Sequence, residues 1–110
     1  MSGIATLAQR KLARTDEIRE GLARLRERLA EYGETHDGQF WLYGSAATGR
    51  IHFESDIDIL TDFDAEQTAA VVDFVEKTCA ALRLKADVQP KTWYTSGYLK
   101  KISAKAQVLP

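Results

Sequence analysis

The chain has few of the residues that mark several specialised classes of protein. Cys79 is the one cysteine among its 110 residues, so no disulfide can form within the chain. This composition fits a reducing compartment. The two prolines, Pro90 and Pro110, both come late, and the sequence contains no repeat or low-complexity stretch. The chain is nevertheless long enough to bury a hydrophobic core without disulfides or a structural metal.

Strong net charge and long apolar runs are also missing. The formal net charge is −1, which argues against a protein that grips nucleic acid through its phosphates, because such proteins concentrate lysine and arginine. Nucleic acid is therefore not expected as a direct ligand. Residues 1–9 lack the apolar centre of a signal peptide, and no apolar run approaches the length of a membrane span. We expect a cytoplasmic protein without membrane attachment.

What the sequence does contain is an ordinary globular balance, with 45% hydrophobic and 28% charged residues. A chain of this length predicts a single domain over residues 1–110. Within it we expect an N-terminal helical segment over residues 1–37 and a core over residues 38–110 that carries the motifs.

The first third of the chain has helical periodicity. Apolar residues recur at three- and four-residue steps and predict one buried stripe, made of Ile18, Leu22, Leu25, Leu29 and Tyr32. Thr15 is a candidate N-cap, and Gly33 is a candidate C-terminal stop. Residues 4–13 either extend this helix or precede it as a separate segment. The arginines of this region alternate with glutamates, which favours a solvated helix face with local ion pairs.

The rest of the chain alternates strands with helices. Strands are predicted at residues 40–43, 57–63 and 84–89, with an edge strand at 107–109. Asp64 is expected to cap a helix, and residues 98–105 predict a last short one. The buried stripe of the helix after Asp64 is expected to be Thr68, Val72, Val75, Cys79 and Leu82. This order indicates the α/β or α+β class, with a small mixed sheet flanked by helices.

Gly44 and Ser45 follow the first predicted strand. A glycine there lets the backbone turn sharply and approach a ligand closely. A serine directly after it can begin a short helix and offer free backbone N–H groups and a hydroxyl to a phosphate. Such a pair is more often an ordinary turn, so it becomes informative only beside the acids that follow.

Asp56 and Asp58 stand at the start of the second predicted strand. Residues two apart in a strand point the same way, so these carboxylates are expected side by side, where they repel each other. A hard dication such as Mg²⁺, which takes oxygen ligands, would make sense of that arrangement. Asp87 lies in the third predicted strand. If that strand neighbours the second, the three carboxylates converge, where they would hold two Mg²⁺ ions and activate an attacking hydroxyl.

Together these parts resemble the signature of a known superfamily. The run Tyr43–Arg50, followed by Ser55–Ile59, is similar to the polymerase-β-like nucleotidyltransferases: Gly-Ser, a glycine four residues on, then Ser-Asp-hydrophobic-Asp-hydrophobic. Asp87, after an intervening helix, resembles their third carboxylate. The short length and the closing stretch 98–109 further resemble the minimal nucleotidyltransferases, many of which are antitoxins beside a HEPN-domain toxin.

The resemblance implies a polymerase-β-like nucleotidyltransferase fold and a phosphate-binding role for four residues. Gly44 and Ser45 would hold the β- and γ-phosphates of ATP or another NTP. Gly49 would let the chain pass close to the triphosphate. Many relatives carry an arginine between the serine and that glycine; here Arg50 follows the glycine instead, and would take over the phosphate contact.

The resemblance also implies the roles of the acids. Asp56 and Asp58 would ligate two Mg²⁺ ions. Asp87 would bind the catalytic metal and help to deprotonate the acceptor hydroxyl, which attacks the α-phosphate and releases pyrophosphate.

These expectations lead to a Mg²⁺-dependent nucleotidyltransferase acting as an antitoxin. It would transfer AMP, or another nucleotidyl group, to a hydroxyl of a partner HEPN toxin, with tyrosine as the expected acceptor. One alternative is a module of the same fold that neutralises its partner by binding, with weak or no catalysis. Another is an enzyme that modifies a small molecule or an RNA end. The three acids favour catalysis, and the modest charge weighs against RNA.

Overall fold

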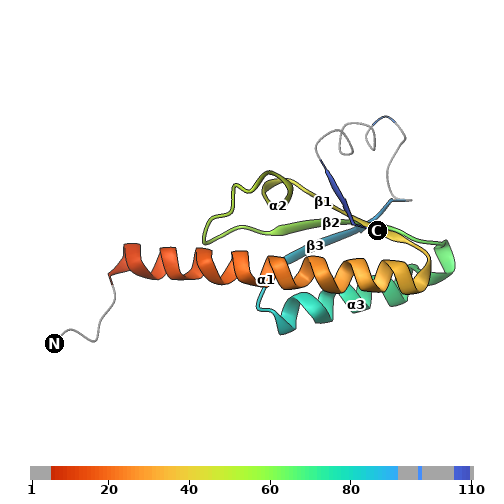
Figure 1. The fold of residues 1–110 in the computed structure, drawn as a ribbon, viewed down its shortest axis with the longest axis horizontal. Coiled ribbons are helices and arrows are strands. Elements are labelled where there is room, and N and C mark those ends of the chain that lie inside the picture. The colour runs from red at the N-terminus through yellow and green to blue at the C-terminus, as the bar shows by residue number, and fades with distance from the viewer. Residues whose placement is uncertain (1–5, 92–96, 98–105, 110) are drawn as a thin grey trace.

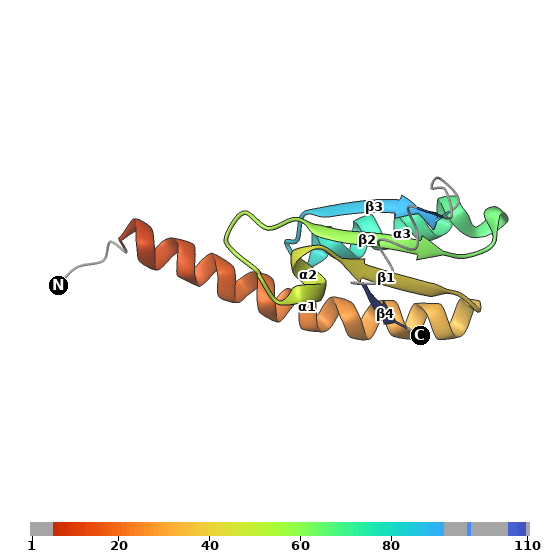
Figure 2. The ribbon, with the colours of Figure 1, turned by 90° about the horizontal axis from the view of Figure 1, so that it is seen from above.

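The computed structural model describes residues 6–91, 97 and 106–109. The elements in chain order are α1 (Leu7–His36), β1 (Gln39–Tyr43), α2 (Ser45–Thr48), β2 (Ile57–Asp62), the 3-10 turn η1 (Ala65–Gln67), α3 (Thr68–Ala81), β3 (Ala86–Pro90) and β4 (Gln107–Leu109). Four strands within these residues form one sheet in the order β3-β2-β1-β4. Helices α1 and α3 lie side by side on one face of this sheet, and the short α2 stands at one end of it (Figures 1 and 2).

The sheet is mixed, because β1 pairs antiparallel with both β2 and β4 while β2 and β3 run parallel. The predicted class, a small mixed sheet with helices, is therefore confirmed, and residues 107–109 form the predicted edge strand. The third strand begins at Ala86 rather than residue 84 and continues through Pro90. A proline is tolerated there because β3 is an edge strand and its outer side needs no N–H donor. The helix predicted at residues 98–105 lies outside the described residues.

The start of α1 differs from the prediction. Its N-cap is Thr6, whose hydroxyl accepts the Gln9 N–H (3.1 Å) while the Gln9 side chain accepts the Thr6 N–H (2.8 Å). This reciprocal pair is a capping box, and from Leu7 onward the upstream segment extends the helix. The prediction that Thr15 is the N-cap is wrong. Thr15 lies in the helix interior, where its hydroxyl donates to the Lys11 carbonyl (2.9 Å).

The end of α1 also differs, because Gly33 does not stop the helix. Three more residues follow to His36, and Asp37 takes the left-handed conformation (φ 57°, ψ 50°) that ends the helix. The Gly33 carbonyl accepts the Gly38 N–H at 2.9 Å. An aspartate therefore fills the position at which sequence reasoning looks for a glycine.

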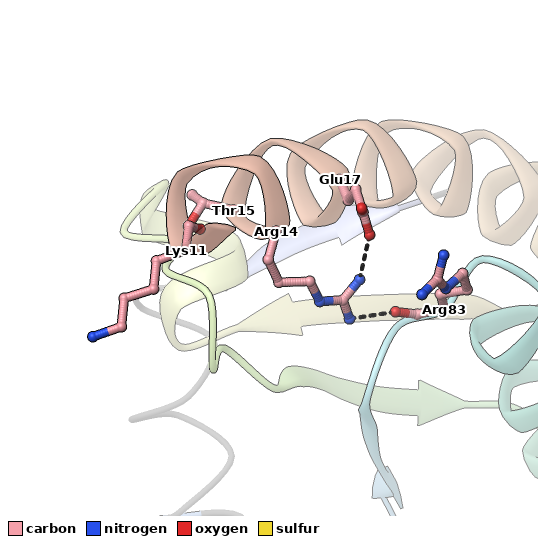
Figure 3. A network of polar contacts seen from close by, with 5 residues as sticks. All are labelled: Lys11, Arg14, Thr15, Glu17 and Arg83. Atoms are coloured by element: carbon pink, nitrogen blue, oxygen red, sulfur yellow. Dashed lines mark hydrogen bonds and ion pairs between the residues drawn. The ribbon is translucent and has the colours of Figure 1, made fainter. Parts of the chain in front are cut away.

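The N-terminal part of α1 extends past the sheet (Figure 1). No described residue before Ile18 is buried, and polar contacts hold this part of the helix instead. Arg14 donates to the Glu17 carboxylate at 3.1 Å and to the backbone carbonyl of Arg83, just after α3 (Figure 3). Among the described residues, no helix is both long and apolar enough to cross a membrane.

The core lies between the helices and one face of the sheet. The predicted stripe of α1 is buried from Ile18 to Leu29, with Tyr32 packed against it. Alternate strand residues meet it: Phe40, Leu42, Ile57 and Ile59. Since strand side chains alternate between faces, Asp58 and Asp87 project from the face of the sheet opposite α1 and α3.

The helix predicted after Asp64 begins later than expected. Asp64 precedes η1 without a side-chain capping bond, and α3 starts at Thr68. Its buried residues are Val71, Val75, Thr78 and Cys79. The predicted stripe is therefore correct at Val75 and Cys79, and Leu82 packs partly buried against the core. Burial raises the pKa of the Cys79 thiol to about 11, which keeps it protonated and makes it a packing group.

Truncating the core stripe of α1 should unfold the domain readily. Leu29 is fully buried, so Leu29→Ala should lower the free energy of unfolding by about 2–5 kcal/mol. Leu12, on the same helix, is 65% exposed, and Leu12→Ala should change the free energy of unfolding by less than about 0.5 kcal/mol. Urea unfolding followed by circular dichroism measures both. Equal losses would contradict the assignment of the core face.

Candidate functional site

The chain turns sharply at the end of β1. Gly44 has φ 65° and ψ −144°, close to a region that only glycine occupies readily. Its carbonyl accepts the N–H groups of Ala47 (3.2 Å) and Thr48 (3.3 Å), which closes the short helix that Ser45 was predicted to begin. At four residues, α2 is too short for a strong dipole. The groups that could bind an anion here are therefore the backbone N–H groups of the turn and the Ser45 hydroxyl, rather than a helix dipole.

The carboxylate of Asp58 lies directly against this turn. Asp58 pairs with Tyr43 across the antiparallel β1–β2 ladder. A Cβ atom built on Gly44 would stand 2.4 Å from Asp58 Oδ2, closer than atoms can approach. The backbone conformation therefore favours glycine here, and any larger residue would also have to displace the Asp58 carboxylate.

Asp87 stands beside Asp58 because β2 and β3 run parallel in register. The ladder pairs Asp58 with Asp87 directly, and the Ile57 N–H donates to the Lys85 carbonyl (2.8 Å) where the pairing begins. Paired residues on adjacent parallel strands project from the same face, with strands about 4.8 Å apart. The condition set by the sequence, that the third strand neighbours the second, is met.

Asp56 enters this group through a tight turn. The Ser55 hydroxyl accepts the His52 N–H (2.8 Å), and the Ser55 N–H donates to the His52 carbonyl (3.0 Å). Ser55 is buried, while Asp56 directly after it is exposed. The serine of the Ser-Asp-hydrophobic-Asp motif thus has a structural part: it closes the turn that leads into β2.

The three carboxylates interact electrostatically. The pKa of Asp58 is raised above its ordinary value, first by burial and then by the negative charges of Asp87 and Asp56. Ionised Asp58 is therefore held at a cost in free energy. Within the described residues, no three acidic, histidine or cysteine side chains already form a group that could hold a metal ion.

The donor set nevertheless fits a hard cation. All three groups are carboxylates, which are the ligands that Mg²⁺ prefers. A divalent cation beside Asp58 would offset the repulsion that raises its pKa. Asp56, Asp58 and Asp87 are thus the residues that would hold it.

Two side chains that the sequence did not single out support the site. Gln89 donates its amide N–H to both carboxylate oxygens of Asp87 (3.2 and 3.4 Å). The pair could have been suspected from their two-residue spacing in a strand, which places both on one face. Arg26, assigned from the sequence to a solvated face of α1, instead donates to the Ala46 carbonyl of α2 (3.0 Å).

Gly49 and Arg50 complete the turn after α2. Gly49 ends α2 with φ 77° and ψ 8°, and a Cβ atom there would meet nothing within 4 Å. The positive φ at this position, rather than contact with a neighbouring atom, explains why the residue is glycine. Arg50 follows as an exposed side chain, so the cation assigned to phosphate binding lies past the end of α2 rather than within it.

Comparison with known proteins gives one finding. A family model described as a nucleotidyltransferase domain matches residues 22–108. The matched range holds all seven candidate residues, from Gly44 to Asp87, and reaches into β4. No curated protein matches the chain.

Placing a methyl group on Gly44 should damage the turn. We expect Gly44→Ala to lower the free energy of unfolding by about 1–3 kcal/mol, because alanine strains the backbone here and its Cβ must also displace the Asp58 carboxylate. Gly49→Ala meets the strain without the collision and should cost less. Urea titrations of the two variants give the comparison, and a larger loss at Gly49 would show that the contact is wrong.

The raised pKa of Asp58 predicts how stability depends on pH. The folded protein binds the proton of the Asp58 carboxyl group more tightly than the unfolded chain does. The stability that this proton gives the folded state is therefore complete at acidic pH and is lost as the pH rises through the folded pKa. Asp58→Asn cannot lose a proton. The melting temperature of this variant relative to wild type should therefore rise as the pH is raised from below 3.8, the ordinary pKa of an aspartate, through the folded pKa of Asp58.

Differential scanning fluorimetry in metal-free buffer measures this difference. Adding Mg²⁺ at neutral pH should raise the melting temperature of wild type more than that of Asp58→Asn, with NaCl of equal ionic strength as control. A pH-independent difference between the two proteins would contradict the charge interaction.

Proposed function

Because the chain belongs to the nucleotidyltransferase domain family, we propose that it transfers a nucleotidyl group from an NTP to a hydroxyl of a partner protein. The observation that carries the proposal is the in-register pairing of Asp58 with Asp87, with Asp58 against the Gly44 turn. It supports the proposal because the Asp58 carboxylate, a candidate cation ligand, lies against the turn that would bind phosphate.

The residues divide the work between binding and proton transfer. Backbone N–H groups after Gly44 and the Ser45 hydroxyl bind the terminal phosphates of the NTP, and Arg50 adds a positive charge at the far end of the turn. Asp56, Asp58 and Asp87 are the residues that would hold Mg²⁺. When bound, Mg²⁺ would neutralise charge on the triphosphate and favour in-line displacement at the α-phosphate.

Asp87 is the residue to which we assign the proton of the acceptor. Gln89 orients its carboxylate, which leaves an oxygen lone pair free to accept the hydroxyl proton. The acceptor oxygen then forms a bond to the α-phosphorus, the bond from that phosphorus to the bridging oxygen breaks, and pyrophosphate leaves. The acceptor keeps the nucleotidyl group.

For the acceptor we propose a HEPN-domain toxin, modified on a tyrosine hydroxyl with AMP or another NMP, so that the chain acts as an antitoxin. The support is the short length of the chain and its closing stretch 98–109, which resemble the minimal nucleotidyltransferases. A second candidate is neutralisation by binding alone. It is favoured by one feature: α2 carries no cation of its own to bind phosphate.

The test is the intact mass of the protein that co-purifies with this chain from its host, after incubation with Mg²⁺ and each NTP. Wild type should add one or more nucleotidyl groups. The double variant Asp56→Asn with Asp58→Asn should lower the rate by on the order of 10³-fold or more. The matched control, Asp64→Asn with Asp73→Asn, removes two exposed acids outside the site and should keep the rate.

Two other outcomes of this mass measurement would decide against transfer. A partner that is neutralised by the double variant as well as by wild type, with unchanged mass, would establish the binding role. If wild type consumes no NTP with any partner, the transfer proposal is wrong.

A further inference from the structure

We propose that Arg26 is a positioning residue for the nucleotide: it sets the placement of the phosphate-binding turn and makes that placement depend on the docking of β4. This inference rests on the proposed function, because it assigns the NTP to the Gly44–Thr48 turn. It concerns a residue of α1 that belongs to neither the Gly-Ser nor the acidic motif.

The guanidinium of Arg26 joins three elements. Its Nη2 donates to the Ala46 carbonyl of α2 (3.0 Å), and its Nε donates to Gln107 Oε1 of β4 (3.1 Å). Arg26 is half-buried and Ala46 is fully buried. The planar guanidinium holds its donors in fixed directions, so satisfying one partner constrains the place of the other.

The contact supplies something that α2 cannot supply itself. The last four carbonyls of a helix accept no hydrogen bond from within it. Because α2 has only four residues, this holds for every one of its carbonyls. Arg26 satisfies one of them with a charged donor, which is stronger than a neutral one. The orientation of Ser45, the residue before Ala46, is thereby fixed from outside the turn.

The link to β4 follows from the sheet as well as from Arg26. β4 is a three-residue edge strand in which Gln107 pairs with Leu42 of β1, two residues before Gly44. The strand ladder and Arg26 thus connect β4 to the same turn by two routes. By linkage, an NTP bound at the turn should favour a docked β4, and a docked β4 should favour the NTP by the same factor.

Four single variants test the role. Arg26→Gln removes the charged donor, Arg26→Lys keeps the charge but cannot reproduce the planar fork, and Gln107→Ala breaks only the link to β4. The matched control is Arg28→Gln, which removes an exposed arginine from the same helix. The readouts are KM and kcat for the NTP that wild type uses, with Mg²⁺, and amide exchange by NMR.

We expect Arg26→Gln to raise KM on the order of 10-fold, as the loss of a charge-assisted hydrogen bond predicts, with kcat changed less than about 3-fold. Arg26→Lys should fall between this variant and wild type. In wild type the NTP should slow amide exchange in residues 107–109, and this effect should disappear in Gln107→Ala. Arg28→Gln should match wild type throughout.

An unchanged KM in Arg26→Gln, or a loss confined to kcat, would overturn the positioning role. If Arg26→Gln does not fold, Arg26→Lys and Gln107→Ala decide the question by the same readouts. If wild type binds no NTP, the proposed function fails while the Arg26 contact is still tested. Exchange of the Ala47 and Thr48 amides in nucleotide-free protein should be faster in Arg26→Gln than in Arg28→Gln, and equal rates would overturn the proposal.

Discussion

The register between β2 and β3 is the constraint on which the site depends. The bond from the Ile57 N–H to the Lys85 carbonyl begins a parallel ladder in which Asp58 stands opposite Asp87. Ile57 and Ile59 are fully buried against the helices, so a slip of one residue would put Asp58 into the core. The hydrophobic effect therefore fixes the position of the acids, because it holds their neighbours on the opposite face.

This arrangement places the acids against their own electrostatic preference. Burial and two nearby negative charges raise the pKa of Asp58, and its carboxylate also fills the space beside Gly44. The fold tolerates the repulsion because the strands are held from the other face by packed aliphatic residues. A bound cation would offset this repulsion, so the three acids suit the proposed metal site.

Sequence reasoning found the parts of this fold that depend on local pattern. The strands at Phe40 and Ile57, the α1 stripe and the turn at Gly44 all follow from spacing and residue type. It failed where two residues could perform the same task. Thr6 and Thr15 are both plausible caps, and only Thr6 has a glutamine three residues later to complete a capping box. Arg26 was missed because its partners lie 20 and 81 residues away, beyond the reach of any helical periodicity.

The motif residues and the residues that place them thus come from different parts of the chain. Gly44, Ser45 and the acids are the candidate chemical groups, but α2 has only four residues and its Ala46 carbonyl is satisfied by Arg26 of α1. A chain could keep every motif residue and still bind an NTP poorly if α1 or β4 were displaced. The edge strand would therefore support the proposed nucleotide site, since Gln107 of β4 contacts the same arginine that donates to the Ala46 carbonyl.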